Sequence, residues 1–170
     1  KKIFLKNLEK FKIKNNKIKI FDDTSLNFPK HYQKISYNKK FDLIHIDGGH
    51  NEKEVINDIK IALKFGTKNS IIIIDDIFNP AFPEVLKAYL RFRKFFFPIF
   101  LTDQKIFLSK NKIFSKKIRK KIINKDFNKK KINFFNQETF YVSENDEKIR
   151  NYLLQKIQMA RSLFYTKYHF

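Results

Sequence analysis

The sequence predicts a doubly wound α/β fold, in which helices cover both faces of a largely parallel sheet. Short runs of β-branched and aromatic residues alternate along the chain with helical patterns. Two of these runs, Phe41–Ile46 and 70–74, are apolar on both faces, as strands of a covered parallel sheet are. The chain has 170 residues, 42% of them hydrophobic, which is enough for one domain with a sizeable core.

The first part of the chain begins this alternation. Apolar residues at helical spacing predict a helix over residues 3–11, and KIKIF at 17–21 predicts a short strand ahead of the acidic turn DDTS. A short helix over Phe28–Ile35 should open near Pro29. The strand Phe41–Ile46 then follows.

A more clearly marked helix comes next. Asn51 is the expected N-cap, Glu54 occupies the capping-box position, and Gly66 is expected to stop the helix. Four apolar residues should form its buried stripe: Val55, Ile59, Ala62 and Leu63. The β-branched run at 70–74 should be the most buried strand of all.

Pro83 is expected to open a further helix that runs to about Phe95. Two strands follow, at 96–101 and 105–109, separated only by the polar letters TDQK. So short a polar connection predicts an antiparallel hairpin. Residues 1–110 therefore make up the predicted α/β domain.

Two further segments are predicted after this domain. Residues 111–136 are rich in Lys and Asn and should form a basic extension, helical over 114–123. Residues 137–170 should form a helical extension, because apolar residues share one face of an amphipathic helix over 147–167. This helix should pack on the domain or on a partner chain, which makes a homo-oligomer an option.

Composition narrows the choice of compartment and partner. Cysteine is absent, which excludes disulfides and thiolate metal sites, and no apolar run approaches the roughly 20 residues of a transmembrane segment. A cytoplasmic protein is therefore expected. The net charge of +20 suggests an anionic partner, but only five of the 37 basic residues are Arg. That shortage favours a general excess of Lys over a nucleic-acid partner.

Acids follow three of the predicted strands. Asp22 and Asp23 come after the first, Asp47 after the second, and Asp75 with Asp76 after the third. Ligands of open α/β sheets bind at the carboxyl ends of strands, and acids there are costly unless they are paired. The last three could therefore hold Mg²⁺ or another divalent cation. The alternative is that all these acids only cap the helices and turns that follow.

Three residues near these acids complete the pattern. Gly48 and Gly49 would let the backbone turn sharply and approach a ligand closely. His50 should project near the same edge, as a general base or a further metal ligand. His45, between two apolar residues of its strand, is expected to be a core histidine and not a ligand.

The segments FDLIHIDGGHNEKEVINDIKIAL and SIIIIDDIF resemble the second half of a class I S-adenosylmethionine-dependent methyltransferase. They are most similar to the branch whose signature is a strand ending in IDG-x-H, a helix, and a strand ending in DD. The resemblance covers residues 3–108 and implies part of a Rossmann-like methyltransferase sheet, whose last strand is antiparallel. That feature agrees with the terminal hairpin predicted above.

The resemblance also implies roles for individual residues. Asp23 and Thr24 would contact adenosine, and Asp47 would lie where the methionine end of the cofactor meets the acceptor. His50 matches the motif histidine, a metal-site or base residue. In metal-dependent members three acids would hold the divalent cation: Asp47, Asp75 and Asp76.

The implied function is transfer of a methyl group from S-adenosyl-L-methionine to a hydroxyl of a small molecule or sugar, with or without a divalent cation. The glycine-rich first motif of such enzymes has no counterpart here, since the three glycines lie at 48, 49 and 66. We therefore expect the carboxy-terminal part of a longer enzyme, which alone would bind the cofactor weakly or not at all. Two alternatives stay open: a basic module that binds nucleic acid or a membrane surface through 111–136, and another metal-dependent α/β enzyme, such as a phosphoryl-transfer enzyme.

Overall fold

The computed structural model describes three stretches of the chain, residues 23–35, 40–124 and 128–143. Residues 1–37 and residues 38–170 are two separate compact units. Four predicted features lie outside the described residues: the helix 3–11, the strand 17–21, the acid Asp22 and the amphipathic helix 147–167.

The first unit contains helix α2 (Phe28–Ile35), which has the bounds that the sequence predicts. A turn leads into it, in which the Asn27 N–H donates to the Thr24 carbonyl at 3.0 Å. Phe28 and Tyr32, one helical turn apart, stack with their ring centroids 5.4 Å apart. This contact and the turn before it stabilise the start of the helix locally.

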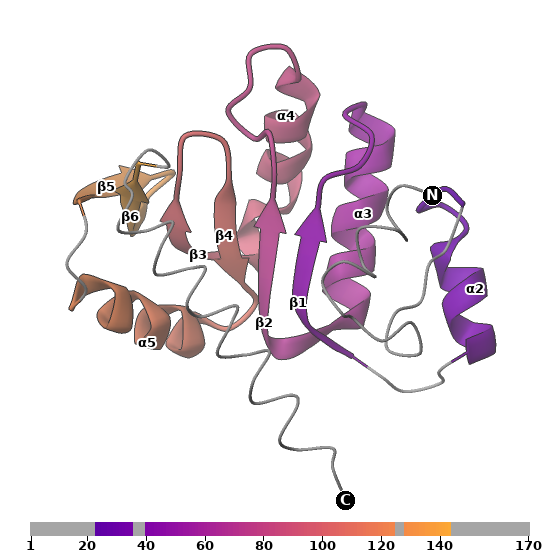
Figure 1. Ribbon diagram of the computed structural model, residues 1–170, viewed down its shortest axis with the longest axis horizontal. Coiled ribbons are helices and arrows are strands. Elements are labelled where there is room, and N and C mark those ends of the chain that lie inside the picture. The colour runs from indigo at the N-terminus through magenta and orange to yellow at the C-terminus, as the bar shows by residue number, and fades with distance from the viewer. Residues whose placement is uncertain (1–22, 36–39, 125–127, 144–170) are drawn as a thin grey trace, which may run out of the picture. The chain divides into compact units, whose positions relative to one another are not determined.

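The second unit is built on one mixed sheet. Its described strands are β1 (Phe41–Ile46), β2 (Gly66–Ile74), β3 (Phe97–Leu101), β4 (Ile106–Ser109), β5 (Lys129–Phe134) and β6 (Gln137–Val142). They are arranged in the order β1-β2-β4-β3-β6-β5 (Figure 1). β1 and β2 are parallel, and β4 lies between β2 and β3, antiparallel to both. The predicted hairpin is thus confirmed, and its second strand is inserted beside β2. This mixed sheet is consistent with a Rossmann-like methyltransferase fold.

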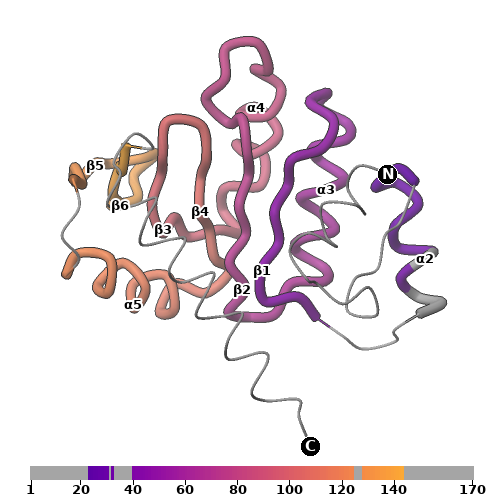
Figure 2. The backbone as a smooth tube through the Cα atoms, viewed as in Figure 1, coloured from indigo at the N-terminus to yellow at the C-terminus, as the bar shows by residue number. Residues whose placement is uncertain are grey.

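Two helices make the connections between the parallel strands. Helix α3 (Glu52–Phe65) joins β1 to β2, and helix α4 (Pro83–Phe92), followed by the 3₁₀ turn η2 (Arg93–Phe95), joins β2 to β3 (Figure 2). Asn51 caps α3 as predicted, with its side-chain oxygen accepting from the Glu54 N–H at 3.0 Å. α3 and α4 pack against each other.

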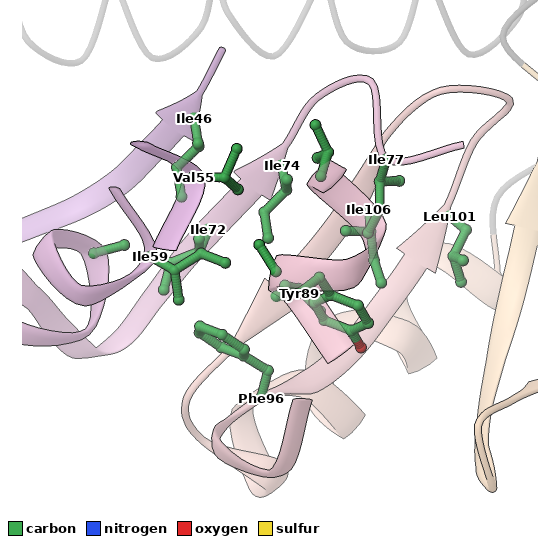
Figure 3. Close-up of a cluster of buried hydrophobic side chains, with 14 residues drawn as sticks. Ile46, Val55, Ile59, Ile72, Ile74, Ile77, Tyr89, Phe96, Leu101 and Ile106 are labelled. Carbon is green, nitrogen blue, oxygen red and sulfur yellow. The ribbon is translucent and has the colours of Figure 1, made fainter. Parts of the chain in front are cut away.

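The core of this unit lies where α3 and α4 meet the sheet (Figure 3). Ile72 and Ile74 of β2 are fully buried there, between Ile59 of α3 and Tyr89 of α4. Burial raises the pKa of the Tyr89 hydroxyl to about 12, so the side chain is neutral at physiological pH. The predicted stripe of α3 is confirmed at its three buried positions, and Leu63 packs against the cluster while partly buried.

Coverage of β1 differs from the prediction. Ile46 is buried, but Leu43 on the other face is 62% exposed and His45 is exposed as well. The prediction that both faces are covered is therefore wrong for this strand, because in the second unit its apolar contacts come from α3 on one face only. An apolar pattern shows that a strand is able to bury both faces, but it does not show that another element covers each face.

The β5–β6 hairpin is the main element that the sequence did not predict. It falls across the predicted boundary at 136, and its second strand lies in the segment expected to be helical. Phe135 and Asn136 form its turn, with φ of 47° and 63°. The Thr139 hydroxyl donates to the Ile99 carbonyl at 3.1 Å, and Ile132 packs against the core. Residues 129–142 are thus part of the sheet.

Helix α5 (Lys112–Ile123) begins two residues earlier than predicted, because Asn111 caps it by accepting from the Ile113 N–H at 2.9 Å. It packs against β3 and β4. The Ser115 hydroxyl, fully buried, donates to the Pro98 carbonyl at 2.8 Å. Its outward surface carries five exposed lysines, at 112, 116, 117, 120 and 121.

Candidate functional site

Three connections of the second unit meet at the carboxyl edge of the sheet. β1 runs into Asp47, and β2 runs into Asp75 and Asp76, while the β3–β4 turn spans residues 102–105 (Figure 1). The Asp75 N–H donates to the Ile46 carbonyl at 3.0 Å, which ties the first two strand ends together. Ligand sites of open α/β sheets lie at this edge.

Asp75 is the most buried acid of this edge. It is 9% exposed, and the Lys105 ammonium of the β3–β4 turn donates to both of its carboxylate oxygens. Burial by itself would raise the pKa of Asp75, but the hydrogen bonds from Lys105 and from the Asp76 N–H outweigh it and hold the pKa below its usual value. Asp75 is therefore a charged, fully paired carboxylate at neutral pH.

His45 approaches the same carboxylate. Its Nε2 lies 3.1 Å from Asp75 Oδ2, and its side chain is 44% exposed. The expectation that His45 is a core histidine is therefore wrong. The strand turns it to the exposed face of β1 and brings it to the acid at the end of β2.

His50 is paired with the second acid of β2. Its Nε2 lies 3.1 Å from Asp76 Oδ2, and its ring stacks on Phe82 with 3.9 Å between centroids and 8° between planes. The Asn79 amide donates to the other oxygen of Asp76 at 3.2 Å. A carboxylate beside Nε2 favours the tautomer that carries its proton there, which leaves the lone pair on Nδ1. The imidazole is thus oriented by one acid and one aromatic ring.

Asp76 has an uncommon backbone conformation. Its φ is 53°, in the left-handed region, and its N–H donates to Asp75 Oδ1 at 2.9 Å. Asp and Asn tolerate this region better than most side chains with a Cβ. The conformation turns the chain directly after β2, so the two consecutive acids contact different histidines: Asp75 contacts His45 and Asp76 contacts His50.

The candidate metal ligands fall into two groups that share Asp47. One group is His45, Asp47 and Asp75; the other is Asp47, His50 and Asp76. Within each group the ligand atoms lie within 4.8 Å of one another. The predicted trio of acids is therefore distributed over both groups, with a histidine in each. Exposed Asp47 is the common member.

The two glycines of the β1–α3 connection differ in their surroundings. A Cβ on Gly49 would lie 1.7 Å from Glu54 Oε2, so this glycine makes room for the protein's own side chain. A Cβ on Gly48 would meet only Asp58 Oδ2, at 3.2 Å. Neither glycine has a positive φ. Gly49 is thus required by the protein's own Glu54, and close approach of a ligand to either glycine stays a prediction.

Asp23 and Thr24 lie in the first unit. Both are exposed, and Asp23 Oδ1 accepts from the Thr24 N–H at 2.7 Å and from the Asn27 amide at 3.0 Å. These contacts organise the turn before α2. The role of the two residues in binding adenosine stays a prediction.

Comparison with known families finds one match, which covers part of the chain. Residues 4–77 match the family model described as a methyltransferase domain, which is less than half of the 170 residues. The matched segment is similar to a methyltransferase domain, in agreement with the resemblance given by its sequence motifs. No curated protein and no solved structure is significantly similar to the chain.

All predicted site residues lie inside the matched segment. Similarity to a methyltransferase domain supports S-adenosyl-L-methionine as the methyl donor. Two residues that shape the site, Phe82 and Lys105, lie beyond the match and were missed by sequence reasoning. Lys105 carried one signal, its position as the last residue of a polar turn at the carboxyl edge. No helix in the described part of the chain has the length and apolar composition needed to cross a membrane.

Proposed function

We propose that the protein is an O-methyltransferase that acts on a hydroxyl of a small molecule or a sugar. The observation that supports this most strongly is the pair of His50 and Asp76, at 3.1 Å, on the edge of the sheet where class I methyltransferases work. A hydroxyl is a poor nucleophile until it loses its proton, so its methylation needs a base or a cation near the acceptor oxygen. An oriented imidazole is suited to the first of these roles.

The proposed roles follow from the contacts of each side chain. S-adenosyl-L-methionine, when bound, supplies an electrophilic methyl group. His50 takes the proton of the acceptor hydroxyl on Nδ1, while Asp76 accepts a hydrogen bond from Nε2 and stabilises the imidazolium. Phe82 holds the ring plane through its stacking contact. Exposed Asp47, at the end of β1, positions the reactants, and positioning supplies much of the rate in such transfers.

A divalent cation is the second way to activate the hydroxyl. Asp47, His50 and Asp76 would then be its ligands, and the cation would lower the pKa of the acceptor as a Lewis acid. Two carboxylates with one imidazole suit Mn²⁺ at least as well as Mg²⁺, which prefers oxygen ligands alone. His50 would serve as a ligand in that case, and the base would be solvent.

The test begins with calorimetry of the full-length gene product and S-adenosyl-L-methionine. Binding is expected, and an intact protein that does not bind would remove the basis of the proposal. Formation of S-adenosylhomocysteine is then followed with hydroxylated acceptors, phenols and sugars among them. His50→Gln and Asp76→Asn should each lower kcat at least about 100-fold, which is the usual contribution of a general base.

Asp103→Asn is the matched control for these variants. Asp103 lies in the turn at the same edge and accepts a hydrogen bond from the Tyr141 hydroxyl, outside both groups of candidate ligands. This variant should turn over at the wild-type rate. Unchanged turnover in both His50→Gln and Asp76→Asn would reject the assignment of the base. Activity that is lost with EDTA and restored by Mn²⁺ would favour the cation over the base.

A second candidate function is binding of nucleic acid through α5. The helix carries five exposed lysines and no acid of its own, although exposed Glu138 of β6 lies near Lys116, and Ile113 among the lysines is 79% exposed. Deleting 111–136 would also remove α5 and β5, which pack into the fold, so Lys→Gln changes at 116, 117 and 120 are the sharper test. If α5 binds, these changes should weaken affinity and flatten its dependence on salt. If the Lys→Gln changes leave the affinity for nucleic acid unaffected, or if the wild type does not bind at moderate salt, the binding would come from the overall positive charge of the chain and not from α5.

A further inference from the structure

The group formed by His45, Asp47 and Asp75 differs from its neighbour in one respect: it already contains a cation. Lys105 donates from its ammonium to both oxygens of Asp75. In the described part of the chain, no Lys or Arg lies within ion-pair distance of Asp76, whose ion pair is with His50. The two groups share Asp47 and have the same types of donor, so the ammonium is what distinguishes them.

Lys105 is held in place by its own turn. The Lys105 N–H donates to the Thr102 hydroxyl at 3.0 Å, and the Thr102 N–H donates to the Lys105 carbonyl at 2.8 Å. The Ile77 N–H donates to the Gln104 carbonyl at 2.9 Å, which fastens this turn to the loop after β2. A lysine on a fixed backbone loses less conformational freedom when it pairs than one on a mobile loop does.

Burial strengthens the pairing. Asp75 is 9% exposed and the Lys105 side chain 30%, so water screens this ion pair less than it screens a surface pair. With neutral histidines, the ammonium leaves one net negative charge in the group of His45, while the group of His50 keeps two. A divalent cation that enters beside Asp75 would have to displace the ammonium or approach it closely.

We propose that Lys105 occupies the cation position of the His45–Asp47–Asp75 group as a tethered ammonium, and so confines any divalent cation to Asp47, His50 and Asp76. Asp75 is then a positioning residue and not a metal ligand. His45 completes the coordination of Asp75 from the exposed face of β1. The proposal concerns cation binding alone and goes beyond the proposed reaction, so its failure would leave that reaction untouched.

Titration of the full-length gene product with Mn²⁺, by calorimetry and by electron paramagnetic resonance of the free ion, tests the proposal. Lys105→Met removes the charge and keeps much of the side-chain volume. It should bind one more Mn²⁺ per chain than the wild type, or bind Mn²⁺ at least tenfold more tightly. Adding Asp75→Asn should cancel the gain. Lys131→Met, which removes an exposed lysine paired with Glu138, should leave binding unchanged.

A second comparison needs no change at Lys105. Asp75→Asn should leave the Mn²⁺ affinity of the wild type within about threefold, whereas Asp76→Asn should lower it at least tenfold. Equal losses in the two variants would overturn the proposal, as would a folded Lys105→Met protein with wild-type stoichiometry and affinity. If Lys105→Met does not fold, Lys105→Gln retains a hydrogen-bond donor and takes its place. If the wild type binds no Mn²⁺, the proposal is tested by the Lys105 variant alone, which should then bind Mn²⁺.

Discussion

The imidazole of His50 lies nearly parallel to the ring of Phe82, with 3.9 Å between ring centroids and 8° between planes. Phe82 immediately precedes α4 and also packs against the hydrophobic core. The orientation of a candidate catalytic side chain is thus coupled to the position of a helix. Asp76, on the loop before that helix, fixes the same ring from its edge.

Replacing Phe82 by Leu should release the ring of His50 while most of the apolar volume is kept. Loss of an aromatic pair costs about 0.5–1.5 kcal/mol, so the protein should stay folded. The ring current of Phe82 should shift the His50 carbon-bound protons upfield in the wild type, and this shift should vanish in the variant. Two-dimensional NMR measures it. Unchanged His50 resonances in the variant would contradict the stacked arrangement.

The Asp75–Lys105 pair should make the free energy of unfolding depend on pH in the acidic range. The folded pKa of Asp75 is depressed, so the stability that it contributes is present above its unfolded pKa of about 3.9 and is lost as the pH falls through the folded value. Lys105→Met should lower the free energy of unfolding at pH 7 by about 1–3 kcal/mol, because it leaves a largely buried carboxylate without its cation. Below about pH 4 the difference from the wild type should shrink.

Thermal unfolding across pH 3–8 measures this effect, with Lys131→Met as the control. The Lys131–Glu138 pair has both side chains more than half exposed, and exposed pairs contribute little. The control should therefore differ from the wild type by less than about 1 kcal/mol at every pH. A Lys105 variant whose loss of stability persists unchanged at pH 3 would show that packing, and not charge, explains the effect.

Gly66→Ala should destabilise the fold more than Gly48→Ala does. A Cβ at Gly66 would lie 2.7 Å from the Ala62 carbonyl oxygen and 2.7 Å from Ser70 Oγ, and the backbone atom cannot move aside easily. Overpacking of this kind costs about 1–3 kcal/mol. At Gly48 the only close atom is Asp58 Oδ2, at 3.2 Å. Urea unfolding compares the two variants, and equal midpoints would contradict the crowding described at Gly66.

The turn of the β5–β6 hairpin should discriminate sharply among side chains. Phe135 has φ of 47°, a region that Asn tolerates and that β-branched residues avoid. Phe135→Asn should stay within about 1 kcal/mol of the wild type, because relief of backbone strain offsets the lost contacts with Phe134 and Arg93. Phe135→Val should cost about 1–3 kcal/mol. Denaturant unfolding measures both, and a Val variant as stable as the Asn variant would contradict the turn geometry.

The parts of the fold that the sequence predicts are those governed by nearby residues. Asn51 predicts the start of α3, and the run of four isoleucines at 71–74 predicts β2. Both signals lie in residues that are adjacent in the sequence. β2 nevertheless begins at Gly66, directly after α3, since an extended backbone at this glycine lets the helix pass into the strand without a loop. Boundaries of this kind depend on pairing with β1, which lies far away in sequence.

The β5–β6 hairpin escaped prediction for physical reasons. Its first strand reads KKKINF, and among the described strands it lies at the edge of the sheet, where charged side chains are exposed and disfavour pairing with other chains. Its turn uses Phe135 and Asn136 in place of the usual Asn-Gly. The first strand therefore lacks the apolar alternation of a typical hairpin strand, and the turn lacks the usual turn residues, so the sequence gives little sign of this hairpin.

The candidate site was predictable as far as its acids, because strand ends that carry carboxylates can be recognised along the chain. Which acid pairs with which partner was not. Lys105 meets Asp75 across 30 residues, and His50 meets Asp76 across 26. The sheet order brings these groups together, and the left-handed backbone of Asp76 separates the two neighbouring acids.

The φ of 53° at Asp76 also limits which residues can stand at this position without loss. Glutamate would keep the charge, yet it tolerates this region less readily than Asp, Asn or Gly do. Alanine would remove the carboxylate and strain the main chain together, so the two effects could not be told apart in one variant. Aspartate at position 76 thus meets two requirements at once, a carboxylate for His50 and a backbone that tolerates the left-handed region.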